Sequence, residues 1–186
     1  MLTTRTPKVL FGFKNWRASD WMPVTDQVRG GISTASLTEV GRCARFSGLL
    51  DTSTLGGAGF ASVKFDKIPF NLDEFEGIKL RVAKSDGKGY TLNLTNEVSS
   101  KRADGRLESV AEFKCGFNTN AQEDAHVVTL PFAAFKPYYR GREITDPSKM
   151  PHLNSSNIVQ VSIMMQSYFD SQKGEFEIDL EAIEAI

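Results

Sequence analysis

The chain has 186 residues, of which 40% are hydrophobic and 24% charged, and its formal net charge is −1. This balance is typical of one globular domain over residues 1–186 and argues against nucleic acid as a partner. No apolar stretch reaches the roughly 20 residues of a membrane-spanning helix.

The N-terminal segment is rich in basic residues, with Arg5, Lys8 and Lys14 and no acid before Asp20. The apolar run 9–13 predicts a strand, and Pro7 disfavours a helix through this stretch. Residues 1–15 are therefore expected to form a flexible or strand-forming arm. Because this segment resembles a mitochondrial presequence only faintly, an intracellular, cytoplasmic location is expected.

Residues 26–33 read Asp-Gln-Val-Arg-Gly-Gly-Ile-Ser, and they are called the glycine turn below. Gly30 and Gly31 allow a positive φ or the close approach of another group. Asp26 can hold its own turn by hydrogen bonds from its side chain to the backbone. The glycine turn contains no nucleophile, general base or metal cluster, which argues against an enzyme.

Alternation of apolar and polar residues with a period of two dominates the rest of the chain and predicts half-buried strands. The clearest runs are 78–83, 90–95, 111–117, 159–165 and 175–180, and shorter candidates are 33–37, 42–49, 60–65 and 126–130. About ten short strands without helical periodicity predict an antiparallel β-sandwich of the jelly-roll type. Asp86-Gly87 between two of the runs predicts a hairpin.

Two long segments interrupt the strands and are predicted to be rim loops, since loops of this length are uncommon and often functional. Residues 98–108 are polar. Residues 136–157 contain three prolines and the cluster Tyr138, Tyr139, Arg140 and Arg142. The acids near the C-terminus, such as Asp179 and Glu184, alternate with apolar residues and are interpreted as the solvent face of a strand.

The residues that usually carry catalysis or bind metals are sparse. His126 and His152 have no Cys or His at ligand spacing, and the two cysteines lie far apart in the sequence. We therefore predict no catalytic residue, no metal site and no cofactor. A calcium site using Asp20, Asp26 and Asp179 is conceivable, but ordinary turn and surface acids are the preferred interpretation.

The glycine turn, preceded by Trp21, resembles the opening motif of the complex I intermediate-associated protein 30 (CIA30) family. Shorter matches follow in order, at 46–48, 59–62, 86–90, 130–135, 140–142 and 174–178. Arg29 stands where the family usually has Met. The resemblance implies a galactose-binding-like β-sandwich and a non-enzymatic role as a chaperone or assembly factor. It also makes the mitochondrion the alternative location.

Two kinds of ligand are considered. The first is a protein partner, such as an intermediate in the assembly of a complex. The candidate surface is Trp21, Asp26, Arg29, Gly30, Gly31, Tyr138, Tyr139, Arg140 and Arg142, because Tyr and Arg favour interface centres. The alternatives are ordinary packing for the tyrosines and structural ion pairs for the arginines. The second ligand is a carbohydrate, for which Trp16 and Trp21 are the candidate platforms, although core packing is the more usual role of Trp beside a strand.

Overall fold

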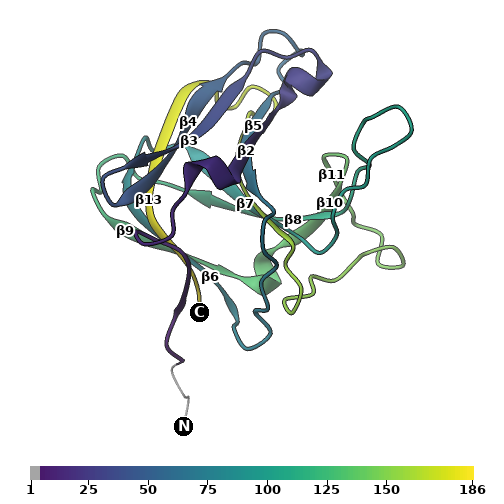
Figure 1. The fold of residues 1–186 in the computed structure, drawn as a ribbon. Coiled ribbons are helices and arrows are strands. Elements are labelled where there is room, and N and C mark those ends of the chain that lie inside the picture. The colour runs from purple at the N-terminus through teal and green to yellow at the C-terminus, as the bar shows by residue number, and fades with distance from the viewer. Residues whose placement is uncertain (1–4) are drawn as a thin grey trace.

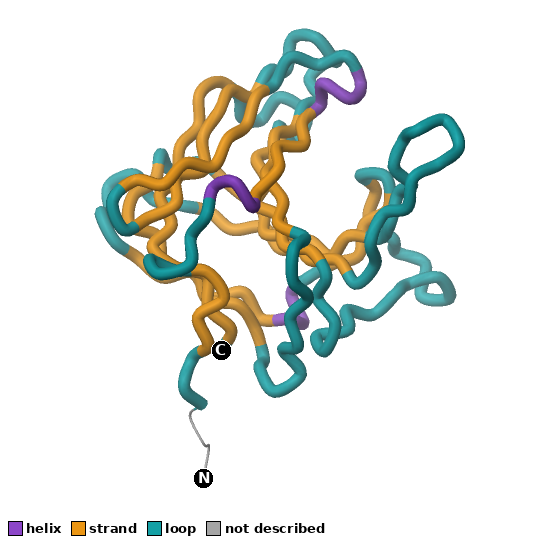
Figure 2. Tube along the Cα trace, in the orientation of Figure 1, coloured by secondary structure: helices purple, strands orange, loops and turns teal. Residues whose placement is uncertain are grey.

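The computed structural model describes residues 5–186, which form two antiparallel sheets packed face to face (Figure 1). Strands make up most of the chain, with three short 3₁₀ turns between them (Figure 2). The elements are β1 (Lys8–Phe11), η1 (Ala18–Asp20), β2 (Trp21–Thr25), η2 (Asp26–Arg29), β3 (Thr34–Val40), β4 (Cys43–Leu50), β5 (Phe60–Phe65), β6 (Gly77–Ser85), β7 (Gly89–Thr95), β8 (Glu112–Asn118), β9 (His126–Pro131), η3 (Phe132–Ala134), β10 (Lys136–Tyr139), β11 (Arg142–Glu143), β12 (Gln160–Gln166) and β13 (Gly174–Ala185). The predicted all-β sandwich is thus confirmed.

The first sheet has six strands in the order β3-β4-β13-β6-β9, with β1 as an additional partner of β13. The long strand β13 pairs with β4 through its first half and with β1 through its last residues. Residues 8–11 of the N-terminal arm therefore form a strand, while residues 1–4 lie outside the described residues. The second sheet has seven strands in the order β11-β10-β8-β7-β12-β5-β2.

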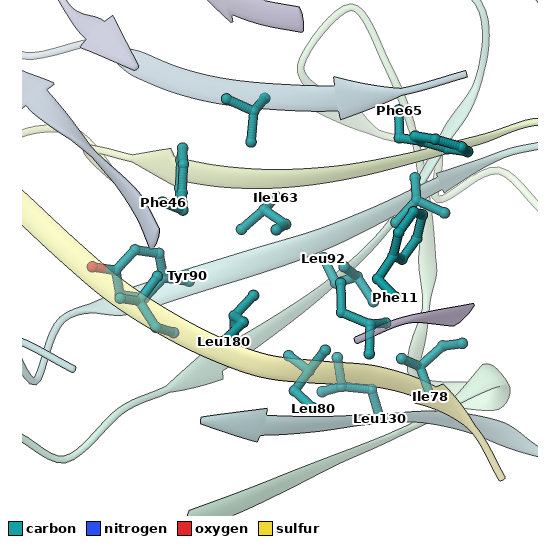
Figure 3. Packing of buried hydrophobic residues seen from close by; sticks show 14 of the residues in the cluster. Phe11, Phe46, Phe65, Ile78, Leu80, Tyr90, Leu92, Leu130, Ile163 and Leu180 are labelled. Carbon is teal, nitrogen blue, oxygen red and sulfur yellow. The ribbon is translucent and has the colours of Figure 1, made fainter. Parts of the chain in front are cut away.

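The core lies between the sheets and consists of the apolar positions of the alternating runs (Figure 3). Leu80, Tyr90, Ile163 and Leu180 are each at most 1% exposed. An apolar side chain at every second position of a strand points to one face, so the period-two pattern is sufficient to build this layer. The predicted inward faces are confirmed.

The predicted Asp86-Gly87 hairpin is wrong, because this turn joins the two sheets. β6 pairs with β13 and β9, whereas β7 pairs with β8 and β12. The Asp86 carboxylate accepts hydrogen bonds from the Tyr90 hydroxyl at 3.0 Å and from the Glu177 backbone N–H at 2.9 Å. These bonds hold the turn as a corner between the layers.

The acids of β13 do alternate with apolar residues, but two of them are not at a solvent face. Asp179 forms a bidentate pair with Arg45, at 2.7 and 2.9 Å. Glu184 lies 2.7 Å from Lys79 Nζ and 3.2 Å from Arg81 Nε. Long basic side chains of β4 and β6 cover both carboxylates, because β13 lies in the middle of its sheet.

Candidate functional site

The glycine turn is built around the buried carboxylate of Asp26. This carboxylate accepts hydrogen bonds from Ser33 N–H at 3.0 Å, Ser33 Oγ at 2.6 Å and Phe60 N–H at 3.2 Å. Ser33 Oγ also accepts a bond from Asp51 N–H at 3.0 Å. One carboxylate therefore connects η2, the residue before β3, the loop before β5 and the start of β5. Asp26 is 1% exposed, so the prediction that it touches a partner is wrong.

Gly30 and Gly31 are required for different reasons. Gly30 ends η2 with φ of +85°, the left-handed conformation that suits glycine. A Cβ on Gly31 would overlap Asp26 Oδ1, so Gly31 is the position where the carboxylate comes close to the backbone. Both glycines follow from the shape of the turn around Asp26.

The glycine turn exposes two apolar and two polar side chains, Gln27 being the second polar one beside Arg29. Val28 is 75% exposed and Ile32 55% exposed, and Arg29 is exposed between them. The 51–59 loop lies next to Asp26 through Gly59 and next to Asp170 through Gly57, so the 167–173 loop belongs to the same end of the sandwich. Phe169 in that loop is 89% exposed. Val28, Arg29, Ile32 and Phe169 are called the rim below.

Trp21 and Trp16 are core residues, so the prediction of Trp21 in a contact surface is wrong. Trp21 is 6% exposed and packs against Phe11 and Phe65, with ring centroids 5.0 and 5.7 Å away. The Trp16 indole donates to the Glu181 carbonyl at 3.1 Å. Neither ring is available as a platform for a sugar, because the N-terminal strand and β5 enclose them.

Tyr138 and Tyr139 lie in a strand, where a loop was predicted. β10 and β11 form a hairpin, in which Tyr138 pairs with Glu143 and Tyr139 with Arg142. Arg140 and Gly141 form its two-residue turn with φ of 50° and 77°. Positive φ at both central residues is the type I′ pattern that matches the twist of paired strands.

Each of the two hairpin tyrosines makes a cation–π contact. Arg140 lies over the Tyr139 ring at 5.3 Å, and Lys114 Nζ lies 5.2 Å from the centre of the Tyr138 ring. Neither Arg140 nor Arg142 is within ion-pair distance of a carboxylate among residues 5–186, so the structural ion-pair alternative fails there. Burial, together with the neighbouring Glu143 carboxylate, raises the pKa of Tyr138.

The glycine turn and the hairpin do not form one surface. The glycine turn follows β2 at one edge of the seven-stranded sheet, and β11 is the opposite edge (Figure 1). Six steps of about 4.8 Å separate these edges. The joint surface expected from the sequence is therefore two surfaces, because sheet order is set by long-range pairing.

A third group of candidate site residues, which was not predicted from the sequence, lies on the outer face of the seven-stranded sheet. Thr91, Asn93 and Thr95 of β7 alternate with the core residues, and each is at most 3% exposed. Asn93, in the middle, has Ser162 of β12 and Lys114 of β8 as its neighbours on the adjacent strands. The sequence contained one clue, since hydroxyl and amide side chains occupy three successive outward positions of this strand.

Among residues 5–186 no group of three or more His, Cys, Asp or Glu side chains is arranged to hold a metal ion. The carboxylates of Asp26 and Asp179, two of the calcium ligands considered above, already accept hydrogen bonds from Ser33 and Arg45. In the same part of the chain, no helix has both the length and the hydropathy of a membrane span.

Solved structures with a similar fold include carbohydrate-binding modules. The family 11 module of a cellulosomal cellulase of Clostridium thermocellum matches with a TM-score of 0.65 and 14% identity, covering 99% of this chain and 96% of that chain. A family 11 module from the same organism, in complex with a β-1,3-1,4-mixed-linked tetrasaccharide, matches at 0.63 and 15% identity, covering 97% and 95%. These similarities confirm the galactose-binding-like sandwich.

Two sequence comparisons are more specific. A protein of Schizosaccharomyces pombe, uncharacterized protein C9E9.15, is 41% identical over 186 residues, covering 96% of this chain and 83% of that protein. The family model "Complex I intermediate-associated protein 30 (CIA30)" matches residues 10–180. This range begins within β1 and ends within β13, so it includes both sheets. The chain therefore belongs to the CIA30 family.

Proposed function

We propose that this protein is a non-enzymatic protein-binding module that assists the assembly of a multi-subunit complex. Membership of the CIA30 family supports this role, because the family is named for association with an intermediate of complex I. The partner we propose is such an assembly intermediate. A cytoplasmic location remains the expectation, with the mitochondrion as the alternative.

The observation that carries the proposal is the rim. Three apolar side chains, Val28, Ile32 and Phe169, face solvent at one end of the sandwich. Large exposed apolar side chains on loops at one end of a domain favour a protein contact there. The backbone beneath Val28 and Ile32 is fixed by the hydrogen bonds of Asp26, so little ordering is required when a partner binds. Arg29 between them adds a residue type that is enriched in interface centres.

The experiment is affinity purification of tagged protein from its native host, with mass spectrometry and cell fractionation. The test variant is Val28→Ser with Ile32→Ser. The matched control is Val98→Ser with Val127→Ser, which also replaces exposed valines, 73% and 52% exposed, away from the rim. We expect the wild type and the control to recover subunits of one complex, and the rim variant to lose them at an unchanged melting temperature. Equal recovery with both variants would contradict the rim as the contact surface.

A further inference from the structure

Three buried polar atoms on the outer face of the seven-stranded sheet have no hydrogen-bond partner among residues 5–186. They are Thr91 Oγ1, Asn93 Oδ1 and Thr95 Oγ1, all on β7. A buried polar atom without a partner loses its hydration and gains no hydrogen bond in exchange, and native proteins contain few such atoms. Three at successive outward positions of one strand indicate partners from outside the chain. We call Thr91, Asn93 and Thr95 the polar row.

The Met164 side chain borders the polar row and is held there weakly. Met164 lies opposite Thr91, and its sulfur is 3.8 Å from Asn93 Nδ2 and 4.0 Å from Lys114 Nζ. A thioether is a weak acceptor on a flexible, unbranched side chain. The Lys114 ammonium is held more firmly, since it lies 3.4 Å from Glu112 Oε2 and 5.2 Å from the centre of the Tyr138 ring. An incoming ligand can therefore displace the Met164 thioether at low cost and reach the polar row.

Two tyrosines border the same face. Tyr138 of β10 is on the Lys114 side, with the Lys114 ammonium 5.2 Å from its ring centre. Tyr168 comes from the loop between β12 and β13, and a Cβ on Gly116 of β8 would be 3.7 Å from its hydroxyl. Tyr168 is 46% exposed, so part of its ring is available to a ligand.

The loop that positions Tyr168 is strained and firmly fixed. Tyr168, Phe169 and Asp170 have φ of 48°, 54° and 68°, a left-handed conformation that residues other than glycine adopt only at an energetic cost. The Thr52 hydroxyl donates to Asp170 at 2.6 Å, and Ser167 Oγ donates to the Gly57 carbonyl at 2.9 Å. Strain that the surroundings maintain in this way often occurs where a side chain must be held for binding.

The chemistry of the face selects the class of ligand. Hydroxyl and amide groups pair with groups that both donate and accept, and tyrosine rings pack against apolar surfaces. Lys114 has Glu112 at 3.4 Å, so the face offers no uncompensated positive charge to an anion. The polar row extends over about 13 Å, at roughly 3.3 Å per residue. A neutral chain of sugar rings combines the required hydroxyls, apolar faces and length.

We propose that the outer face of the seven-stranded sheet binds a neutral oligosaccharide along β7, with the polar row hydrogen-bonded to sugar hydroxyls and Tyr168 packed against a ring. This site shares the 167–173 loop with the rim, through Tyr168 and Phe169. The variants that test the two sites lie in different elements, Val28 and Ile32 in the glycine turn and Thr91 and Thr95 on β7, so loss of either binding activity leaves the other measurable.

The test is isothermal titration of the full chain with neutral tetrasaccharides of glucose, mannose, galactose and xylose. The variants are Thr91→Val and Thr95→Val, which keep the shape and remove the unpartnered hydroxyl. The control is Thr38→Val, at an exposed position of β3 in the other sheet. We expect millimolar or tighter binding by the wild type and the control, weakened at least about tenfold in each β7 variant.

Thermal melting separates this proposal from a structural role. Removal of a hydroxyl that has no partner should leave the melting temperature of the β7 variants unchanged or higher, whereas a structural hydrogen bond through water would make it lower. The proposal is overturned if the wild type shows no heat of binding with any of the four tetrasaccharides at millimolar concentration. Undiminished binding by both β7 variants, or a lowered melting temperature in both, overturns it as well.

Discussion

At the scale of single residues, the glycine turn depends on Asp26. Its carboxylate receives three hydrogen bonds from Ser33 and Phe60 in an environment that excludes water. Bonds to an ionised acceptor are roughly twice as strong as neutral ones, and a buried donor that loses its acceptor is costly. Asp26 is therefore a positioning residue that gives the exposed rim its shape.

The two glycines allow a direct comparison of strain with steric overlap. Gly30→Ala should lower the free energy of unfolding by about 1 kcal/mol, because only the positive φ opposes a side chain in open space. Gly31→Ala should lower it by more, about 2–3 kcal/mol, because the new Cβ displaces the Asp26 carboxylate and its bonds. Urea denaturation measures both. A Gly31→Ala midpoint equal to that of the wild type would refute the close approach.

At the scale of elements, the central strand β13 is held to its neighbours by ion pairs. Burial acts to raise the pKa of Glu184, but hydrogen bonds and charge from Lys79 and Arg81 outweigh it, so the pKa lies below the ordinary glutamate value. A carboxyl group with a lower pKa in the folded state stabilises the fold above its unfolded pKa. This contribution is lost as the pH falls through the folded value.

Glu184→Gln should therefore remove part of the acid sensitivity of the protein. We expect the melting temperature of the wild type to decrease as the pH falls below about 4.3, the ordinary pKa of a glutamate side chain. The variant should start from a lower melting temperature at pH 7 and fall less over the same range. Glu175→Gln, at an exposed position of the same strand, is the control and should follow the wild type. Parallel pH profiles for Glu184→Gln and the wild type would disprove the linkage.

At the scale of the whole molecule, the corner at Asp86 connects the two sheets. Its carboxylate binds the Tyr90 hydroxyl within the core and the Glu177 N–H of β13. Burial is the main cause of the raised pKa of Tyr90, so this hydroxyl remains a hydrogen-bond donor throughout the physiological range. The two layers thus share a polar contact here in addition to the one that Asp26 makes with Ser33 and Phe60.

A double-mutant cycle tests this connection. Tyr90→Phe should cost about 1 kcal/mol, and Asp86→Ala about 2–3 kcal/mol, because the second change leaves both the Tyr90 hydroxyl and the Glu177 N–H without their acceptor. The double variant should cost less than the sum, since both changes remove the same bond. Chemical denaturation gives the three values, with Tyr139→Phe, a partly exposed tyrosine, as the neutral control. Strict additivity would show that the bond contributes nothing to the packing of the sheets.

Local patterns in the sequence were sufficient to predict much of the fold. The alternation in 78–83 and 90–95 specified which side chains enter the core, because the side-chain period of a strand is fixed at two. The glycine turn was identified from the spacing of Asp26, Gly30 and Gly31. The prediction of a hairpin at Asp86-Gly87 was wrong, because the same dipeptide can join strands of one sheet or of two. Only the pairing with distant strands decides between them.

The sequence by itself determined the β class, the inward faces of the strands and the family, all of which depend on residues close together in the chain. The tertiary structure decided where those residues lie. It buried Trp21 and Asp26, and it put the glycine turn and the Tyr138–Arg142 hairpin at opposite edges of one sheet. It also left three side-chain oxygens of the polar row without a hydrogen-bond partner among residues 5–186. The physical reason is that burial and sheet order depend on contacts between residues far apart in sequence, such as Trp21 with Phe65 and Ser62 with Met164.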